Sequence, residues 1–277
     1  MPVWSVVFGA VVGLSLGLTG TGGSIFAVPL LIYGLGVEPR AAIGASLVAI
    51  GATALVGFLQ RLRAGLVDLR TGLLLAAASM PVVPVGTWLG AKVSEPVLLS
   101  LFALLMLVVA LRMWRGAAAR SVDKARLANP DEPGSDARQD PQGAPQWSRR
   151  SGLLVAAAGL AVGFLTGFFG VGGGLFIVPL LVLAGGMRIE RAIGTTLLVM
   201  ALVSSMGVAS LIFSGRTLPW TTVGWFTGGS LLGMAVGSRL AARLSGPTLR
   251  RLFAGLVLLV ALFVLFRNLA WRSFLAG

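Results

Sequence analysis

The sequence contains no cysteine and no histidine, and only nine of its residues are acidic. Disulfides, thiolate chemistry, haem ligation by histidine and histidine proton relays are therefore excluded. Charged residues make up 11% of the 277 residues, whereas a soluble domain carries about a quarter. The low charge excludes an ordinary soluble domain. The missing cysteines say little about the redox compartment, because any membrane protein can do without them.

Hydrophobic residues make up 56% of the chain and gather in long runs rich in Leu, Ala, Val and Gly. These runs exceed the roughly 9–11 residues of a membrane strand, and they lack the in–out alternation of a β-barrel. The sequence therefore predicts an all-α polytopic membrane protein. The N-terminal segment has no basic region and no evident cleavage site, so we expect it to stay in the membrane.

One part of the sequence is repeated 150 residues later. GGSIFAVPLL begins at Gly22 and GGGLFIVPLL begins at Gly172, and further glycines keep the same register. After one inserted residue the match resumes, so that the run 101–111 corresponds to 252–262. Chance similarity of apolar runs would not keep glycine and proline in register, and we therefore interpret the chain as two copies of one unit.

The repeat predicts three parts: a first transmembrane repeat at 1–114, a flexible linker at 115–150 and a second transmembrane repeat at 151–277. The linker is polar and rich in Pro and Gly, without an apolar period. Each repeat contains five apolar segments, which we place at 3–19, 24–35, 40–60, 69–91 and 96–114, and at 152–169, 174–185, 190–213, 219–242 and 248–268. Five is an odd number, so the second copy is expected to enter the membrane upside down. The second segment of each copy is short, and it either spans as a broken helix or re-enters.

Positive charge follows the same inverted arrangement. With the N-terminus outside, seventeen Lys and Arg residues fall on the inner side and five on the outer side. The loop after the third segment holds Arg61, Arg63 and Arg70 in the first copy, but Arg216 alone in the second. We predict a multi-pass protein of the inner membrane with both termini outside and the linker in the cytoplasm. The net charge of +13 is then explained by cytoplasmic loops, and we expect no nucleic-acid partner.

Two glycine-rich breaks, at 19–24 and 169–174, each precede a short helix. Each break presents a helix N-terminus with unpaired N–H groups and a partial positive charge, which binds anions. We expect the two ends to face each other near the midplane and hold an anion there. The alternative is that the glycines serve only close helix packing. The candidate substrate-binding residues are Thr19, Gly20, Thr21, Gly22, Gly23, Ser24, Gly170, Val171, Gly172, Gly173, Gly174, Ser46, Thr195 and Thr196.

Every Asp and Glu falls in a predicted loop or in the linker, so a buried carboxylate relay for protons is not expected. An anion leaving a negative-inside cell needs none, because the membrane potential supplies about 2.3 kcal/mol per charge per 100 mV. This favours efflux by facilitated transport and leaves uptake open. No catalytic residue, metal or cofactor is expected, and the sequence does not decide whether the protein is a homodimer.

The paired glycine motifs at 20–31 and 170–181, each followed by A-x-G-[AT]-[ST]-L, resemble those of the TauE/SafE sulfite exporter family, also called the 4-toluene sulfonate uptake permease family. The resemblance covers both halves and leaves out the linker. It implies an inner-membrane permease for sulfur-containing anions such as sulfite, thiosulfate or organosulfonates. The copies differ at Ser24 and Gly174, which leaves the substrate open. A permease for another small anionic or neutral metabolite is the alternative.

Overall fold

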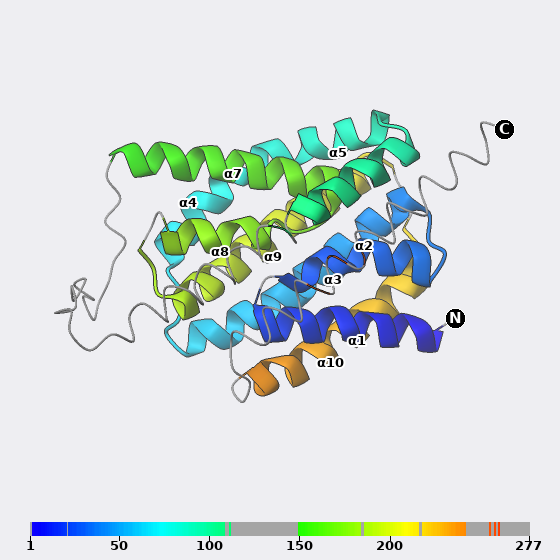
Figure 1. Ribbon diagram of the computed structural model, residues 1–277, viewed down its shortest axis with the longest axis horizontal. Helices are drawn as coiled ribbons and strands as arrows, with labels where there is room; N and C mark the ends of the chain where they lie inside the picture. The colour runs from blue at the N-terminus through cyan, green and yellow to red at the C-terminus, as the bar shows by residue number, and fades with distance from the viewer. Residues whose placement is uncertain are drawn as a thin grey trace.

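The computed structural model describes residues 2–20, 22–108, 111, 149–183, 186–215, 218–241, 255, 258 and 260. All regular secondary structure in these ranges is helical, which confirms the predicted all-α fold. The helices run mainly along the long axis of the molecule (Figure 1). Of the predicted parts, most of the linker at 115–150 and most of the last segment at 248–268 lie outside the described residues.

The helices of the first copy follow the predicted segments closely. They are α1 (Pro2–Thr19), the 3₁₀ turn η1 (Gly22–Phe26), α2 (Ala27–Pro29), the π turn η2 (Leu30–Gly34), α3 (Pro39–Arg63), α4 (Leu69–Ser79), the 3₁₀ turn η3 (Met80–Val82) and α5 (Val83–Lys92). A further helix covers Glu95–Val108. The second copy contributes α7 (Arg149–Phe169), α8 (Gly174–Leu183), α9 (Ile189–Phe213) and α10 (Trp220–Ala241).

Local signals in the sequence explain where two of these helices begin. Pro39 opens α3 at the first helical position, where its missing N–H group costs nothing. Asp68 caps α4, because its side chain accepts a hydrogen bond from the backbone N–H of Thr71 at 3.0 Å. Both residues stand where a loop ends, and they determine where α3 and α4 begin.

Four of the described helices are long and apolar enough to cross a membrane. They are Pro2–Thr19, Pro39–Arg63, the continuous path Leu69–Lys92 and Ile189–Phe213. Large apolar side chains are exposed on the outer faces of these helices, where lipid would cover them. Trp4, Trp88 and Trp220 are more than half exposed and lie near helix ends, as an aromatic belt requires.

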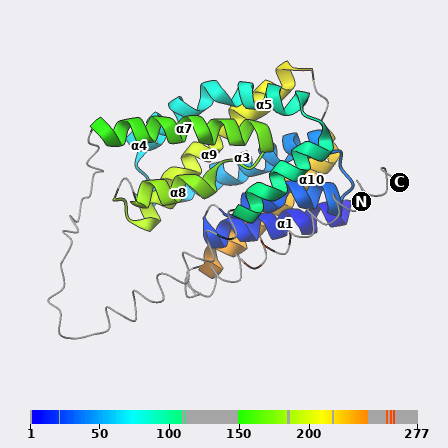
Figure 2. The same ribbon diagram turned by 45° about the horizontal axis from the view of Figure 1, so that its top comes forward.

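The two corresponding helices α3 and α9 pack against each other in opposite directions. A Cβ atom built on Gly44 would lie 3.1 Å from Leu211, one on Gly51 would lie 3.1 Å from Ser204, and one on Gly57 would lie 3.1 Å from Leu197. Along this contact the residue numbers rise in α3 while they fall in α9, so the two helices are antiparallel. The helices α1 and α7 also begin at opposite ends of the molecule, in both orientations shown (Figures 1 and 2).

The first helix of each copy packs on the fourth segment of the other copy. The backbone of α1 at Gly13 approaches Ser230 of α10, and that of α7 at Gly163 approaches Ser79 of α4. A Cβ atom on either glycine would lie within 3.0 Å of the Cα atom of its partner, so a side chain does not fit there. These two contacts correspond to each other in the repeat, and they support the inverted arrangement that the charges predict.

Candidate functional site

The second break has a backbone that requires glycine. α7 ends at Phe169 and α8 begins at Gly174, and three residues between them have positive φ: Gly170 at 71°, Gly172 at 70° and Gly173 at 66°. Side chains other than glycine rarely adopt this conformation. In the first break Gly20 has a φ of 78°, and the chain continues into the 3₁₀ turn η1 rather than directly into an α-helix. The two breaks therefore share a glycine with positive φ at corresponding positions, but they differ in the kind of helix that follows.

Each break packs against the central helix of the other copy. A Cβ atom on Gly170 would lie 3.0 Å from the Ile43 side chain of α3, and one on Gly20 would collide with the Ile193 side chain of α9. Ile43 and Ile193 correspond in the repeat. The breaks thus meet the antiparallel pair α3 and α9, each close to the start of the helix from the other copy.

Ser46 ties α3 to the second break. Its Oγ atom lies 2.7 Å from the carbonyl oxygen of Ile43 and 2.9 Å from that of Gly170, and its side chain is completely buried. The hydroxyl has one proton to share between these two oxygens. In this conformation Ser46 therefore holds the backbone of the break in place and has no proton left to donate to a substrate.

The two threonines predicted near the site do not meet the second break. Thr195 Oγ1 accepts a hydrogen bond of 2.9 Å from the backbone N–H of Asp68, in the loop that follows α3. Thr196 donates to the carbonyl oxygen of Ala192 in its own helix at 2.7 Å. Thr196 follows Ile193 by three residues and so lies in the part of α9 that packs on the first break.

Thr19 and Ser24 are the hydroxyl-bearing residues that the structure describes in the first break. Thr19 donates to the carbonyl oxygen of Ser15 at 2.7 Å, and Ser24 is fully buried in η1. Gly23 packs closely on Leu16 of α1, since a Cβ atom there would lie 2.8 Å from the Leu16 Cα atom. Thr21 is outside the described residues.

Two hydroxyl groups beside the second break were not predicted as site residues. Thr166 Oγ1 and Ser204 Oγ are buried and have no hydrogen-bond partner, and both residues have an exposed fraction of 0%. Burying a hydroxyl without a partner costs about 1–3 kcal/mol. A signal for both exists in the repeat: their counterparts in the first copy are the apolar Leu16 and Ala54. A comparison of the two copies for positions that are polar in one copy and apolar in the other would identify Thr166 and Ser204.

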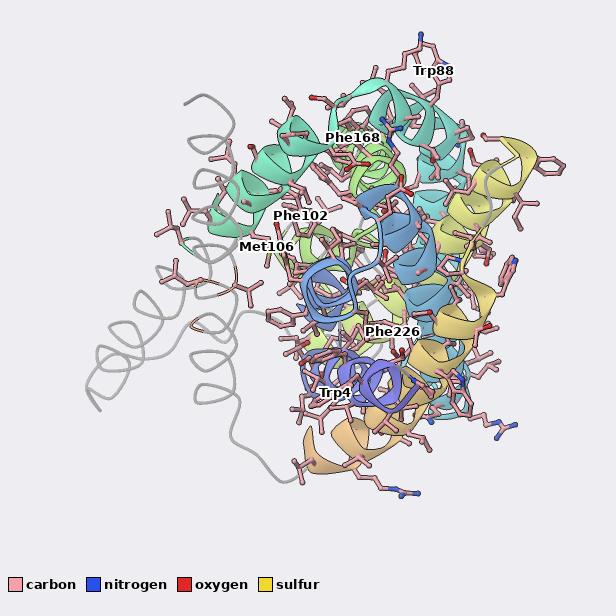
Figure 3. The ribbon with its side chains drawn as sticks, turned by 90° about the vertical axis from the view of Figure 1, so that its right-hand side faces the viewer. Trp4, Trp88, Phe102, Met106, Phe168 and Phe226 are labelled. Atoms are coloured by element: carbon pink, nitrogen blue, oxygen red, sulfur yellow. The ribbon has the colours of Figure 1, made fainter. Side chains whose placement is uncertain are left out.

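Aromatic side chains close the second break on one side. Phe169 stands directly before Gly170, with its ring centroid 5.7 Å from that of Phe102 and 4.7 Å from that of Phe168. Figure 3 shows Phe102 and Phe168 between the helices, whereas Trp88 lies at the periphery. A cavity of about 10 Å³ borders Phe102 and Phe169, which is about the space of one water molecule.

A larger depression, of about 450 Å³, opens at the surface near the start of α3. Its lining includes Val37, Glu38 and Leu218, from the loops before α3 and α10. According to the predicted topology, this end of α3 faces the outside. The part of the chain that the structure describes contains no group of three His, Cys, Asp or Glu side chains that could hold a metal ion.

Comparison with known proteins places the chain in a family. The model of the family described as "Sulfite exporter TauE/SafE" matches residues 5–264. A "Probable membrane transporter protein" of Xylella fastidiosa (strain 9a5c) is 34% identical over 273 residues, which cover 97% of this chain and 95% of the relative. The "Probable membrane transporter protein YunE" of Bacillus subtilis (strain 168) is 28% identical over 86% of this chain and 89% of its own length. No solved structure matches the chain. The chain therefore belongs to the sulfite exporter TauE/SafE family of membrane transporters.

Proposed function

We propose that the protein is a permease that moves small sulfur-containing anions, such as sulfite, thiosulfate or organosulfonates, out of the cell across the inner membrane. The observation that carries this proposal is the placement of the glycine breaks. Both lie against the antiparallel helices α3 and α9, each on the helix of the other copy. Transporters built from inverted repeats bind substrate where such interrupted helices meet.

The chemistry of the breaks fits an anion better than a cation. The interior around them contains helix N-termini, hydroxyls and apolar side chains. The acidic residues Glu38, Asp68 and Glu190 lie at helix ends or loops. A negative charge is stabilised by the N-terminal end of a helix. A cation would find no carboxylate among the residues named here to balance its charge.

The proposed topology places both termini outside and the linker in the cytoplasm, with the repeats at 1–114 and 151–277. The charge distribution supports it. The end of α3 also lies beside the start of α9, where Arg61 Nη1 donates to the carbonyl oxygen of Glu190 at 3.2 Å, which agrees with opposite directions of the two helices but does not bear on the side of the membrane. Alternating access then requires the two copies to move relative to each other, because the cavity that the described residues leave beside Phe102 and Phe169 has a volume of about 10 Å³.

Flux measurements in proteoliposomes test this function. Sulfite, thiosulfate and methanesulfonate would be compared with taurine, which is a zwitterion at neutral pH, with chloride and with a cation, under an imposed negative-inside potential. We expect transport of the sulfur-containing anions that responds to the potential. Transport of a cation or a neutral solute with no sulfite or sulfonate flux would contradict the proposal.

The role of the breaks is tested by the double variant Gly22→Val/Gly172→Val. A side chain at Gly172 is strained by the positive φ, and it would also meet Ile50 at 2.9 Å. The control is Gly36→Val/Gly186→Val, because these glycines also have positive φ but have open space around them. We expect flux to be lost in the first variant and kept in the control. If the first variant elutes as folded protein and transports normally, the breaks do not form the anion site.

A further inference from the structure

Thr166 and Ser204 depart from a pattern that several other buried hydroxyls among the described residues follow. Buried Ser and Thr side chains in membrane helices usually bond to a carbonyl oxygen one turn earlier in their own helix. Thr53, Ser79, Thr87 and others do so here, at 2.6–2.9 Å. Thr166 and Ser204 are fully buried but make no hydrogen bond at all. Thr227 also has no partner, but it is only partly buried.

Each of the two hydroxyls lies beside one of two adjacent glycines of the second break. A Cβ atom on Gly173 would lie 3.1 Å from Thr166 Oγ1, and one on Gly172 would lie 3.7 Å from Ser204 Oγ. Thr166 lies in the last turn of α7, and Ser204 lies in the middle of α9. Two unpartnered donors from different helices therefore converge on one short stretch of backbone.

The start of α8 lies directly after this stretch. α8 begins at Gly174 and has ten residues, so its N-terminus carries the partial positive charge of a helix end. The N–H group of Phe176 donates to Gly173 at 3.1 Å, which leaves the N–H groups at the very start of the helix to find other partners. Gly172 and Gly173 have no side chains that could stand between this helix end and the two hydroxyls.

The other side chains nearest to Gly172 and Gly173 are apolar. A Cβ atom on Gly172 would lie 2.9 Å from Ile50 Cγ2 and 3.2 Å from Met200 Cε, and Val162 adjoins Gly173. The named neighbours are all neutral, so a single negative charge can be balanced by hydrogen bonds and the helix end, whereas a second charge would remain unbalanced. The close approach of Ile50 means that an anion enters only when α3 shifts away from the break.

We propose that Thr166 and Ser204 donate hydrogen bonds to the transported anion at the second break, and that this break is the principal binding site and selects monoanions. The inference rests on the proposed function and narrows it to one of the two breaks and to monoanions, which are hydrogensulfite and organosulfonates rather than the dianion thiosulfate. The first copy has Leu16 and Ala54 at the corresponding positions and so lacks these donors. An oxyanion such as an alkanesulfonate places its oxygens toward the donors and its apolar part toward Ile50 and Met200.

The test compares transport by the wild-type protein with Thr166→Val and Ser204→Ala in proteoliposomes, using methanesulfonate as monoanion, sulfate as dianion and dimethyl sulfone as neutral analogue. Hydrogen bonds to charged groups are strong enough that each loss is expected to raise KM for methanesulfonate about tenfold or more. Thr166→Ser and Ser204→Thr keep the hydroxyl and should restore the wild-type KM. The controls Thr87→Val and Ser205→Ala remove hydroxyls that bond within their own helices, and should leave KM unchanged.

Thermal unfolding in detergent separates binding from a structural role. Because the two hydroxyls are unpartnered without substrate, removing them should leave the melting temperature of the substrate-free protein unchanged or raise it, while the shift caused by methanesulfonate should shrink. A lower melting temperature with an unchanged KM would overturn the inference and leave the proposed function intact. If the wild-type protein shows neither flux nor a thermal shift with any anion, the proposed function and the inference both fail.

Discussion

At the residue scale, side-chain hydroxyls connect the two copies in the described structure by hydrogen bonds to backbone groups. Ser46 is the clearest case, because it joins α3 to the carbonyl oxygen of Gly170 across 124 positions of the chain. Thr195 makes a similar connection to Asp68 across 127 positions. Both hydroxyls hold an element of one copy against an element of the other, where the two copies must move if access alternates.

The variant Ser46→Ala tests this locking role. It removes the hydrogen bond to Gly170 and is expected to lower the free energy of unfolding by about 0.5–1.5 kcal/mol and to slow anion flux. The control is Ser79→Ala, because Ser79 is equally buried but bonds only to Leu75 in its own helix. Thermal unfolding and flux would be measured together. Equal effects of the two substitutions on flux would show that Ser46 has no special role at the break.

The sequence predicted the glycines of both breaks but not the partners of the hydroxyls. Gly20, Gly170 and Gly172 stand out because they recur at a fixed offset, and their positive φ explains why glycine is needed. The bond from Thr195 to Asp68 depends on the conformation of a loop, and the isolation of Thr166 depends on three helices packing together. Neither property is visible in local composition.

At the element scale, the positions of glycine along a helix determine which of its faces can pack closely on another helix. Along α10, Gly229 and Gly233 lie so close to the backbone of α1 that a Cβ atom would meet Val6 and Ala10. The adjacent Gly228 has nothing within 4 Å of such an atom. Close approach of small residues stabilises helix pairs in membranes, where apolar lipid provides no hydrophobic drive for association.

Comparing Gly229→Ile with Gly228→Ile tests the contact between α1 and α10. Isoleucine at 229 must push α1 away, so we expect a loss of about 1–3 kcal/mol or more and less folded protein. Isoleucine at 228 adds the same side chain one residue earlier, in open space, and should be tolerated. Size-exclusion profiles and thermal unfolding in detergent would measure both. Equal destabilisation by the two variants would contradict the packing seen between α1 and α10.

The bounds of the long helices were predicted well because long apolar runs leave few alternatives in a membrane. The segment expected at 40–60 is α3 (Pro39–Arg63), and that expected at 190–213 is α9 (Ile189–Phe213). The short segment at 24–35 was predicted as one helix, but it changes from a 3₁₀ turn to α and then to π. Pro29 has no N–H group to continue the regular ladder, and periodicity alone does not reveal this change.

At the scale of the whole molecule, two independent properties point to inverted copies. One is the opposite charge of corresponding loops, which comes from the sequence. The other is the antiparallel packing of α3 and α9, which are corresponding helices. Parallel copies would carry the same charge in corresponding loops, and α3 and α9 would then run in the same direction. The linker sequence contributes to neither property, so its role as a tether stays a prediction.

Cysteine labelling tests this topology, and the chain suits it because it contains no cysteine of its own. Ala64 and Ser214 correspond in the repeat, and both are exposed directly after α3 and α9. Inverted copies place these two positions on opposite sides of the membrane, whereas parallel copies place them on the same side. We therefore expect an impermeant maleimide to label Ser214→Cys in intact spheroplasts and Ala64→Cys only in inside-out vesicles. Labelling of both from one side would exclude the inverted repeat, and with it a site formed by glycine breaks approaching from opposite directions.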